Sequence, residues 1–311
     1  MAKVAIITRT KNRAIMLRRA AASVRSQTRR DFVWVVVNDG GDPAPVDDIV
    51  AHSGISDVTV IHHPVNKGME AASNAGLKHP AAQACDYVVI HDDDDTWEPE
   101  FLAKTVSFLE SDHGTRFGGV ICGTVHVDEV IRDTSVDIVS TKFWQTATGL
   151  YPEGAVQIAD MAVGNQFAPI AFVYRMRLLD EVGFYDEDLP VLGDWDFNLR
   201  FMMKADIAVI PERLANYHHR IASGDTNQHY GNSVSAGYLR HYQREAMIRN
   251  EIIRKAARGG DPTIAALMIS GRHHQTTRVY MHNARRIGDL IATVSRPLFA
   301  SAKTLLKAVR R

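Results

Sequence analysis

Residues 87–95 have the sequence YVVIHDDDD, in which an apolar run ends in four adjacent aspartates. A short apolar run of this kind favours a strand that is buried on both faces of a sheet. Adjacent carboxylates repel one another, so the four aspartates need either a bound cation or many hydrogen-bond donors around them. The stretch therefore predicts a buried strand that ends in a charged site.

Short β-branched runs alternate with helical periodicity over the first two thirds of the chain, which is the pattern of a mostly parallel sheet covered on both faces. The pattern predicts strands at 3–8, 32–38, 58–62 and 87–91, and helices at 14–26, 47–52 and 68–79. In open sheets of this kind, ligands bind beyond the carboxyl ends of the strands. All four strand ends are polar, and we expect them to form one rim from residues 8–13, 38–42, 62–64 and 91–95.

The later part of the chain predicts an extension of this sheet. We expect a helix after Pro99 that ends near Ser111, and strands at 118–127 and 131–140 that pair in antiparallel fashion. A strand-like segment over 169–174, helices at 178–182 and 194–203, and short strands at 207–210 and 214–218 follow. The chain then turns helical from 234 to 258 and breaks at the sequence GGDP, residues 259–262.

The expected organisation is an α/β catalytic domain with a helical extension. The catalytic domain covers residues 1–230, with a donor half at about 1–97 and an acceptor half at about 98–230, and the extension covers 231–311. Apolar residues make up 45% of the chain and charged residues 23%, which is typical of a folded globular protein. The 36 basic and 36 acidic side chains balance, so no global field indicates nucleic acid as a partner.

Two features of the sequence bear on the cellular compartment. Cys85 and Cys122 lie in apolar stretches and lack the spacing of a metal site or a disulfide framework, which favours two buried thiols. The N-terminal residues lack the apolar region of a signal peptide, and no apolar run reaches the roughly 18 residues of a membrane span. We therefore expect a cytoplasmic protein.

Three features of the rim have both a binding and a structural interpretation. Asp92 and Asp94 can hold Mg²⁺ or Mn²⁺, which commonly bind through carboxylates and substrate phosphates, or they can belong to a solvated acidic loop. Asp39 can accept hydrogen bonds from a base or a ribose, although Asp-Gly turns are common. Lys67 can offset phosphate charge or simply lie on the surface.

Two more polar clusters follow in the second half of the chain. Asp194 opens a predicted helix and is either its N-cap or, if the helix begins beside the rim, a base that takes a proton from an attacking hydroxyl. His218, His219 and Arg220 end the last predicted strand. They are either surface residues, or one histidine ligates a metal and the arginine contacts phosphate.

The order of these motifs resembles glycosyltransferase family 2, of the inverting, bacterial surface-polysaccharide type. AIITRTKNR at 5–13 is similar to the family's strand followed by Pro-Thr-Tyr-Asn-Arg, although Arg9 and Lys11 depart from it. SQT at 26–28, VNDGG at 37–41, and NKG to NAG over 66–76 resemble the next motifs. The four aspartates, followed by Trp97 and Pro99, resemble the Asp-x-Asp motif. The resemblance covers about residues 3–220 and implies a GT-A fold, a Rossmann-like mixed sheet flanked by helices.

The resemblance also implies a role for each matching residue. Asp194 is the expected base, and the missing glutamate at Gly193, where the family often has Glu-Asp, bears on acceptor positioning. The expected ligands of Mn²⁺ or Mg²⁺ are Asp92, Asp94 and His219. Asp39 is expected at the nucleobase, Asp92 at the ribose or the metal, and Asp94 at the metal and diphosphate. The full set of expected nucleotide contacts is Thr8, Thr10, Arg13, Asp39, Lys67, Asp92 and Asp93, with supporting roles for Asp95, Trp195, His218 and Arg220.

The expected activity is inverting transfer of one sugar from a nucleotide-diphosphate sugar to a hydroxyl. UDP-sugars are the first expectation for the donor, with dTDP- and GDP-sugars as alternatives, and the acceptor is a glycan or lipid-linked oligosaccharide in polysaccharide or lipopolysaccharide synthesis. Two other functions fit the same residues less well. A sugar-phosphate nucleotidyltransferase should carry a glycine-rich loop after its first strand, and residues 8–13 contain no glycine. A non-catalytic nucleotide-sugar or glycan-binding module would not need Asp94 and Asp194.

The C-terminal tail is basic and amphipathic. Over residues 278–311, Leu, Ile and Val alternate with Lys and Arg in a helical pattern. A basic amphipathic helix favours attachment to a membrane surface, here the inner face of the cell membrane. The alternatives are packing onto the catalytic domain and a junction to further domains.

Overall fold

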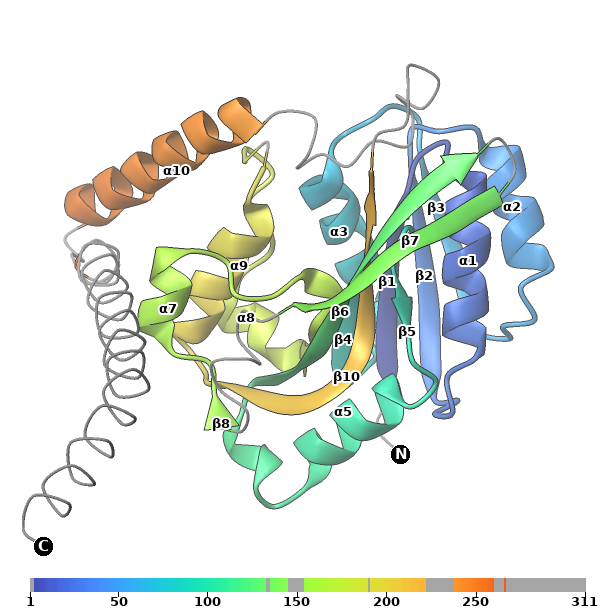
Figure 1. Ribbon diagram of the computed structural model, residues 1–311. Helices are drawn as coiled ribbons and strands as arrows, with labels where there is room; N and C mark the ends of the chain where they lie inside the picture. Colours follow the sequence, from blue (N-terminus) through green and yellow to red (C-terminus); the bar gives the residue numbers. More distant parts are fainter. Residues whose placement is uncertain are drawn as a thin grey trace, which may run out of the picture.

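The described residues form one mixed β-sheet with helices packed against it (Figure 1). This computed structural model describes residues 3–132, 135–144, 154–189, 191–221, 238–259 and 266. The strand order is β3-β2-β1-β4-β9-β6-β10-β5, with β7 paired to β6 and β8 paired to β10. The α/β class and mixed sheet expected from the sequence are confirmed.

The four predicted strands of the first half form the parallel part of the sheet. Parallel register pairs Thr10 with Asn38, and Arg9 with Asp92. The polar residues that end neighbouring strands therefore lie side by side. These strands are β1 (Val4–Thr10), β2 (Phe32–Asp39), β3 (Val58–His63) and β4 (Tyr87–Asp92).

Helices cover both faces of the sheet, because successive side chains in a strand point to opposite faces. In β1, Val4 and Ile6 belong to one core, and Ala5 and Ile7 belong to the other. The first core is covered by α1 (Ala14–Arg25), α2 (Pro43–Ala51) and α5 (Phe101–Glu110). The second is covered by α3 (Met69–Leu77), α4 (Pro80–Gln83), α7 (Ile158–Val163), α8 (Leu179–Val182) and α9 (Gly193–Met202).

The second half of the chain extends the sheet beyond β4. Strand β9 runs antiparallel to both β4 and β6, and the hairpin partner β7 runs antiparallel to β6, as predicted. Among these elements, β6 and β7 are long and the others are short. The strands are β5 (Thr96–Trp97), β6 (Gly119–Arg132), β7 (Ser135–Trp144), β8 (Gly154–Ala155) and β9 (Phe172–Arg175), and the 3₁₀-helices are η1 (Gly114–Arg116), η2 (Pro169–Ala171) and η3 (Met176–Leu178).

The two short strands expected at 207–210 and 214–218 are one strand, β10 (Ile207–Arg220). Its pairing with β6 shifts register between Ile210 and Arg213, and again between Arg213 and Ala215. Pro211 lies in this irregular stretch and lacks the backbone N–H that a regular ladder needs. The prediction of two strands was wrong because the chain passes through a bulge without leaving the sheet.

Helix α10 (Tyr238–Arg258) belongs to the expected helical extension and lies beside α7 and α9 (Figure 1). Arg249 donates to the carbonyl oxygens of Ala162, at 3.0 Å, and Val163. Its guanidinium carbon lies 4.4 Å from the centroid of the Trp195 ring. The basic tail at 278–311 lies outside the described residues. No helix among the described residues is long and apolar enough to cross a membrane.

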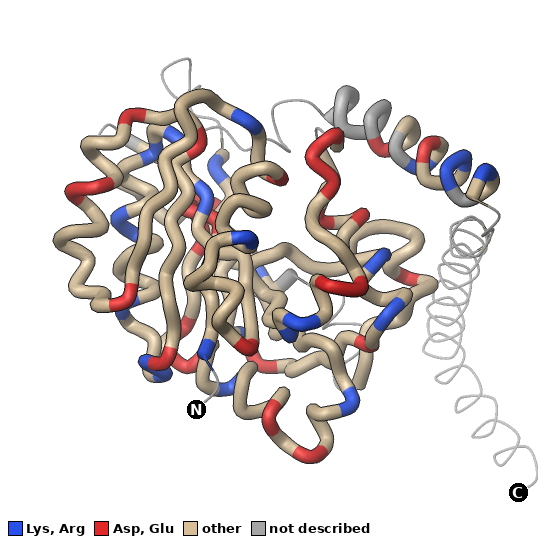
Figure 2. Tube along the Cα trace, turned by 180° about the vertical axis from the view of Figure 1, so that it is seen from behind, with Lys and Arg blue, Asp and Glu red and all other residues tan. Residues whose placement is uncertain are grey.

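Charged residues of both signs are interspersed along the described chain (Figure 2).

A small residue decides how closely α3 approaches the sheet. A Cβ added to Gly76 would lie 2.3 Å from Cγ2 of Ile7 and 3.4 Å from Cγ2 of Val37. Since α3 leads directly out of the rim, this close contact fixes the position of its first turn relative to β1 and β2.

Replacing Gly76 with valine should destabilise the protein by about 1–3 kcal/mol, the usual range for overpacking a filled core. The free energy of unfolding in urea measures this effect. The matched control is Gly164→Ala, because a Cβ at Gly164 meets nothing within 4 Å. Equal stabilities of the two variants would contradict the close packing of α3.

Candidate active site

Two adjoining cavities open at the rim formed by the strand ends. The first, of about 320 Å³, contains Asp39, Lys67 and Arg13 in its wall. The second, of about 440 Å³, contains Asp194 and His219. Both volumes are within the usual range for small-molecule sites. Four residues belong to both walls, so the cavities meet at Arg9, Met69, Glu70 and Asp92.

Arginines from both halves of the sheet form ion pairs with members of the four adjacent aspartates, residues 92–95, which we call the aspartate run. Arg9 pairs with Oδ1 of Asp92, and Arg13 pairs with Asp93 at 2.5 Å and with Asp94 at 3.2 Å. Asp94 also receives Arg220 of β10 at 2.5 Å. The negative charge of the four adjacent aspartates is therefore balanced at least in part by the guanidinium groups of these arginines.

Burial and these arginines pull the pKa values of the run in opposite directions. Burial raises the pKa of Asp93 to about 7, although Arg13 opposes the shift. Burial also raises the pKa of Asp95 well above its usual value. Burial alone would raise the pKa of Asp94 as well, but Arg13 and Arg220 outweigh it and lower that pKa. Asp94 is therefore the member of this trio that stays ionised most readily.

Asp39 connects the end of β2 to the first turn of α3. Oδ1 accepts hydrogen bonds from His63 at 2.8 Å and from the backbone N–H of Lys67 at 2.9 Å, and Oδ2 accepts one from the N–H of Gly68 at 2.9 Å. Burial would raise the pKa of Asp39, but these hydrogen bonds outweigh it and lower the pKa. The turn that contains Asp39 includes Gly40, whose φ of +72° suits glycine. Asp39 is thus ionised and held rigidly at the wall of the first cavity.

Asp194 lies within the first turn of α9 rather than at its N-cap. The N-cap is Leu192, a non-glycine residue with the uncommon φ of 63°. The Asp194 carboxylate accepts hydrogen bonds from the N–H of Trp195 at 2.9 Å and from Nδ2 of Asn165 at 2.6 Å. Burial raises its pKa. A carboxylate with a raised pKa at a cavity wall is suited to accept a proton.

Glu70 is a rim residue that the sequence did not single out. It lies in the first turn of α3, is only 7% exposed, and forms part of both cavity walls. Burial raises its pKa, and the charges of Asp194 and Asp92 act in the same direction, against Arg9. A Cβ on Gly193 would lie 2.5 Å from both Cγ and Oε1 of Glu70. A second carboxyl group therefore reaches the space beside Asp194, from a different helix.

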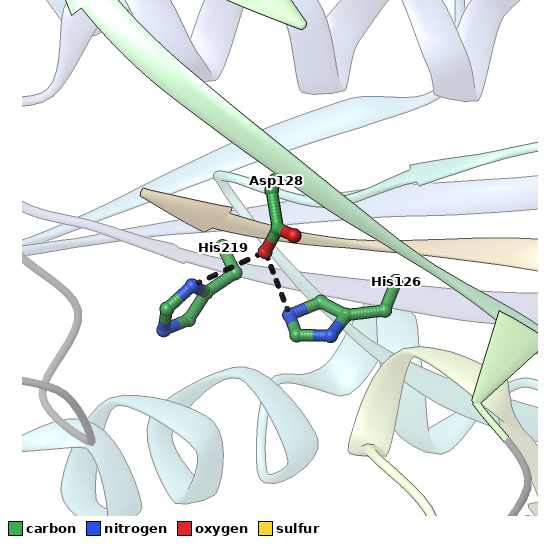
Figure 3. Close-up of side chains that lie close together, drawn as sticks. All are labelled: His126, Asp128 and His219. Atoms are coloured by element: carbon green, nitrogen blue, oxygen red, sulfur yellow. Dashed lines mark ion pairs between the residues drawn. The ribbon is translucent and has the colours of Figure 1, made fainter. Parts of the chain in front are cut away.

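A histidine pair and an aspartate gather on β6 and β10 (Figure 3). Ligand atoms of His126, Asp128 and His219 all lie within 4.8 Å of one another. Among the described residues, this is the one group of three or more such side chains that close together. His219 was expected to act with Asp92 and Asp94, and the structure brings it next to His126 and Asp128.

The other predicted site residues fall into three groups. Thr10, Arg13 and Lys67 line the first cavity. Thr8 is fully buried and accepts a hydrogen bond from Nε1 of Trp34 at 2.8 Å, so it supports the strand end from within the core. The remaining residues pack beneath the rim and hold its parts together, namely Asp95, Trp195, His218 and Arg220.

The sequence contained local evidence for some of the rim residues that were not predicted. His126 lies in the strand predicted at 118–127, and Asp128 follows directly after that predicted end. Two residues apart in one strand, they share a face of the sheet. Arg9 was noticed only as a departure from a motif, yet it pairs with Asp92 and donates to Ser73 Oγ at 3.1 Å. Glu70 had no such signal, because its importance depends on a contact with a residue more than one hundred positions away.

The mixed sheet flanked by helices is the GT-A fold of glycosyltransferases. The chain belongs to the family described as glycosyl transferase family 2, whose family model matches residues 5–164. It is 30% identical to the glycosyltransferase YwdF of Bacillus subtilis (strain 168) over 199 residues, which cover 64% of this chain and 67% of that protein.

Solved structures have the same fold at lower identity. S. aureus TarS 1–349 in complex with UDP-GlcNAc gives a TM-score of 0.52 at 20% identity, covering 81% of this chain and 66% of that chain. The mannosyltransferase PcManGT from Pyrobaculum calidifontis, in complex with GDP-Man and Mn²⁺, gives 0.52 at 16% identity, covering 97% of this chain and 83% of that chain. The chain thus spans slightly less than two thirds of this TarS chain.

The buried Asp93 should make stability depend on pH. Because its folded pKa is about 7, above the ordinary 3.8, native Asp93 keeps a proton between these values that the unfolded chain has lost. Its contribution to stability is therefore lost as the pH rises through this range. Asp93→Asn removes this dependence, so the stability of the variant relative to wild type should increase from pH 5 to pH 8. Urea unfolding at both pH values measures it.

The same substitution at the exposed Asp112 serves as the control for the loss of a carboxyl group at the surface. A relative stability of Asp93→Asn that stays constant or falls towards pH 8 would show that Arg13 outweighs the burial of Asp93.

Proposed function

We propose that this protein is an inverting glycosyltransferase that moves one sugar from a nucleotide-diphosphate sugar to an acceptor hydroxyl. The observation that carries the proposal is the position of Asp92 where two cavities meet. One wall offers Asp39 and Lys67 to a nucleotide, and the other offers Asp194 to an acceptor. Membership of glycosyl transferase family 2 argues against the nucleotidyltransferase alternative.

The first cavity suits the nucleotide part of the donor. Asp39 is the acceptor for N–H or O–H groups of the base or ribose, and Arg13 and Lys67 supply positive charge for the diphosphate. Thr10 belongs to the same wall. TarS and PcManGT are described in complex with UDP-GlcNAc and with GDP-Man, which supports a nucleotide-sugar as the donor class. A UDP-sugar is the donor to test first, with dTDP- and GDP-sugars next.

Asp92 and Asp94 are the residues that would hold Mn²⁺ or Mg²⁺. Their oxygens suit these cations, which usually bind through one or two carboxylates together with substrate phosphates. Only Oδ1 of Asp92 is engaged by Arg9, and its other oxygen has no partner among the described residues, so the carboxylate can accept a ligand. When bound, the cation would neutralise the diphosphate as it leaves.

Asp194 is the proposed base. As the acceptor oxygen attacks C1, its proton passes to the Asp194 carboxylate, and the bond from C1 to the diphosphate oxygen breaks with its electron pair leaving on the diphosphate. Attack from the face opposite the diphosphate inverts the configuration at C1. Asn165, which is itself held by Nδ2 of Asn198 at 3.0 Å, orients the carboxylate. Glu70 belongs to the same cavity wall and would help to position the acceptor beside Asp194.

The acceptor class is proposed from the family resemblance. A glycan or lipid-linked oligosaccharide in polysaccharide or lipopolysaccharide synthesis would present the hydroxyl. The second cavity carries both apolar and polar groups, including Phe167, Tyr185 and Tyr217. Aromatic rings of this kind suit the apolar faces of sugars, which supports a saccharide at this position. A basic tail at the inner membrane face would bring a lipid-linked acceptor close.

Asp194→Asn should lower the rate of sugar transfer by about 10²- to 10⁴-fold, the usual contribution of a general base. The affinity for the nucleotide should change little, because Asp194 belongs to the second cavity only. Release of nucleoside diphosphate in the presence of acceptor measures the rate. Asp196→Asn is the matched control on the same helix, since Asp196 pairs with Arg200 at 2.8 Å and not with the site. Similar rates for both variants would refute the role of Asp194.

Asp39→Asn should weaken binding of the nucleoside diphosphate at least about tenfold, because it removes a charged acceptor from the cavity wall and sets an amide against backbone N–H groups. Titration calorimetry with UDP, dTDP and GDP in the presence of Mn²⁺ measures the affinity and identifies the nucleotide. The control is Asp47→Asn, an exposed partner of His62 on the neighbouring helix. Unchanged affinity in Asp39→Asn, with the fold intact by circular dichroism, would place the nucleotide elsewhere.

A further inference from the structure

The cluster of His126, Asp128 and His219 has the composition of a metal site that is separate from the aspartate run. We propose that these three side chains bind one divalent transition-metal ion at the wall of the second cavity. The proposal rests on the geometry of the cluster and stands independently of the sugar transfer proposed above.

Strand geometry brings the three side chains to one face of the sheet. His126 and Asp128 are two residues apart on β6, so they point the same way. The parallel register pairs Asp128 with His219 of β10. The intervening His218 points to the other face, where it binds Glu129 at 2.8 Å. Neighbouring strands thus deliver two imidazoles and one carboxylate to a single position (Figure 3).

The distances within the cluster suit ligands of a shared ion better than direct hydrogen bonds. Oδ1 of Asp128 lies 3.7 Å from Nε2 of His126 and 3.6 Å from Nδ1 of His219. Both separations exceed the usual hydrogen-bond range. Ligand atoms held at about 2.1 Å in a tetrahedron lie about 3.4 Å apart, so small shifts would complete the site.

The surroundings orient the carboxylate and leave one imidazole nitrogen unsatisfied. Oδ2 of Asp128 accepts a hydrogen bond from Oγ of Ser140 at 2.7 Å, which leaves Oδ1 facing the two rings. Nε2 of His126 is buried and has no hydrogen-bond partner among the described residues. Buried polar atoms normally have partners, and a metal ion would supply one here.

The donor set indicates the class of metal and what the ion could do. Two imidazoles and one carboxylate suit Zn²⁺, Co²⁺ or Mn²⁺ better than Mg²⁺, which prefers oxygen. Three protein ligands leave at least one position for water or for a substrate oxygen. Since His126 and His219 line the second cavity, that position would be available to a ligand there. His219 therefore belongs to this site, and the aspartate run keeps its own oxygen ligands.

Cobalt titration of the whole 311-residue chain, freed of metal and without nucleotide, tests the proposal. The wild type should bind one equivalent of Co²⁺ with a visible absorption band, and Zn²⁺ should displace it. His126→Ala and His219→Ala should each weaken binding at least about 100-fold, and Ser140→Ala about 10-fold, as expected for an orienting residue. Asp128→Asn should also lose the absorption band. Because asparagine has nearly the same shape as aspartate, a cavity left by a smaller side chain cannot explain that loss.

Two controls separate this site from the aspartate run and from surface histidines. Asp92→Asn and His52→Ala, which replaces an exposed histidine, should keep the cobalt band unchanged. A band that survives in both His126→Ala and His219→Ala, or one that disappears in Asp92→Asn, would overturn the proposal. Circular dichroism of each metal-free variant verifies the fold. Nucleotide affinity of the same samples reports separately on the proposed transferase site.

Discussion

The ion pairs between the aspartate run and three arginines depend on the whole order of the sheet. Arg9 and Arg13 come from the end of β1 or just after it, and Arg220 comes from the end of β10, on the other side of β4. Without these partners, adjacent carboxylates at the end of a buried strand would repel one another strongly. The charge of the run therefore holds the two halves of the sheet together at the place where the cavities meet.

Residues of β10 alternate between the protein interior and the second cavity, so one strand both stabilises the sheet and lines the site. Side chains at alternate positions face opposite sides of the sheet. His218 faces inward, where it bonds to Glu129 and its N–H binds Asp95 at 2.8 Å. His219, the next residue, lines the second cavity. A shift of one residue in the pairing with β6 would exchange these environments.

Local sequence patterns predicted the parts of the fold that depend on neighbouring residues. Apolar runs and turn residues located β1 to β4, and the polar strand ends correctly brought Asp39 and Asp92 to one rim. Contacts between distant segments were not predictable in this way. The contact of Arg9 with Ser73 and the position of Glu70 depend on the packing of α3, and the bulge at Pro211 depends on the pairing of β10 with β6. The nearness of His219 to Asp128 likewise required the register between two strands.

The contact between Gly193 and Glu70 has a consequence for how the sequence can vary. A side chain at position 193 would meet the Glu70 side chain in its present conformation, so Glu70 would have to move to make room for it. The two positions should therefore covary among relatives, with glycine at 193 accompanying glutamate at 70. A single replacement at either position would then be disfavoured, while a paired exchange would keep one carboxyl group beside Asp194.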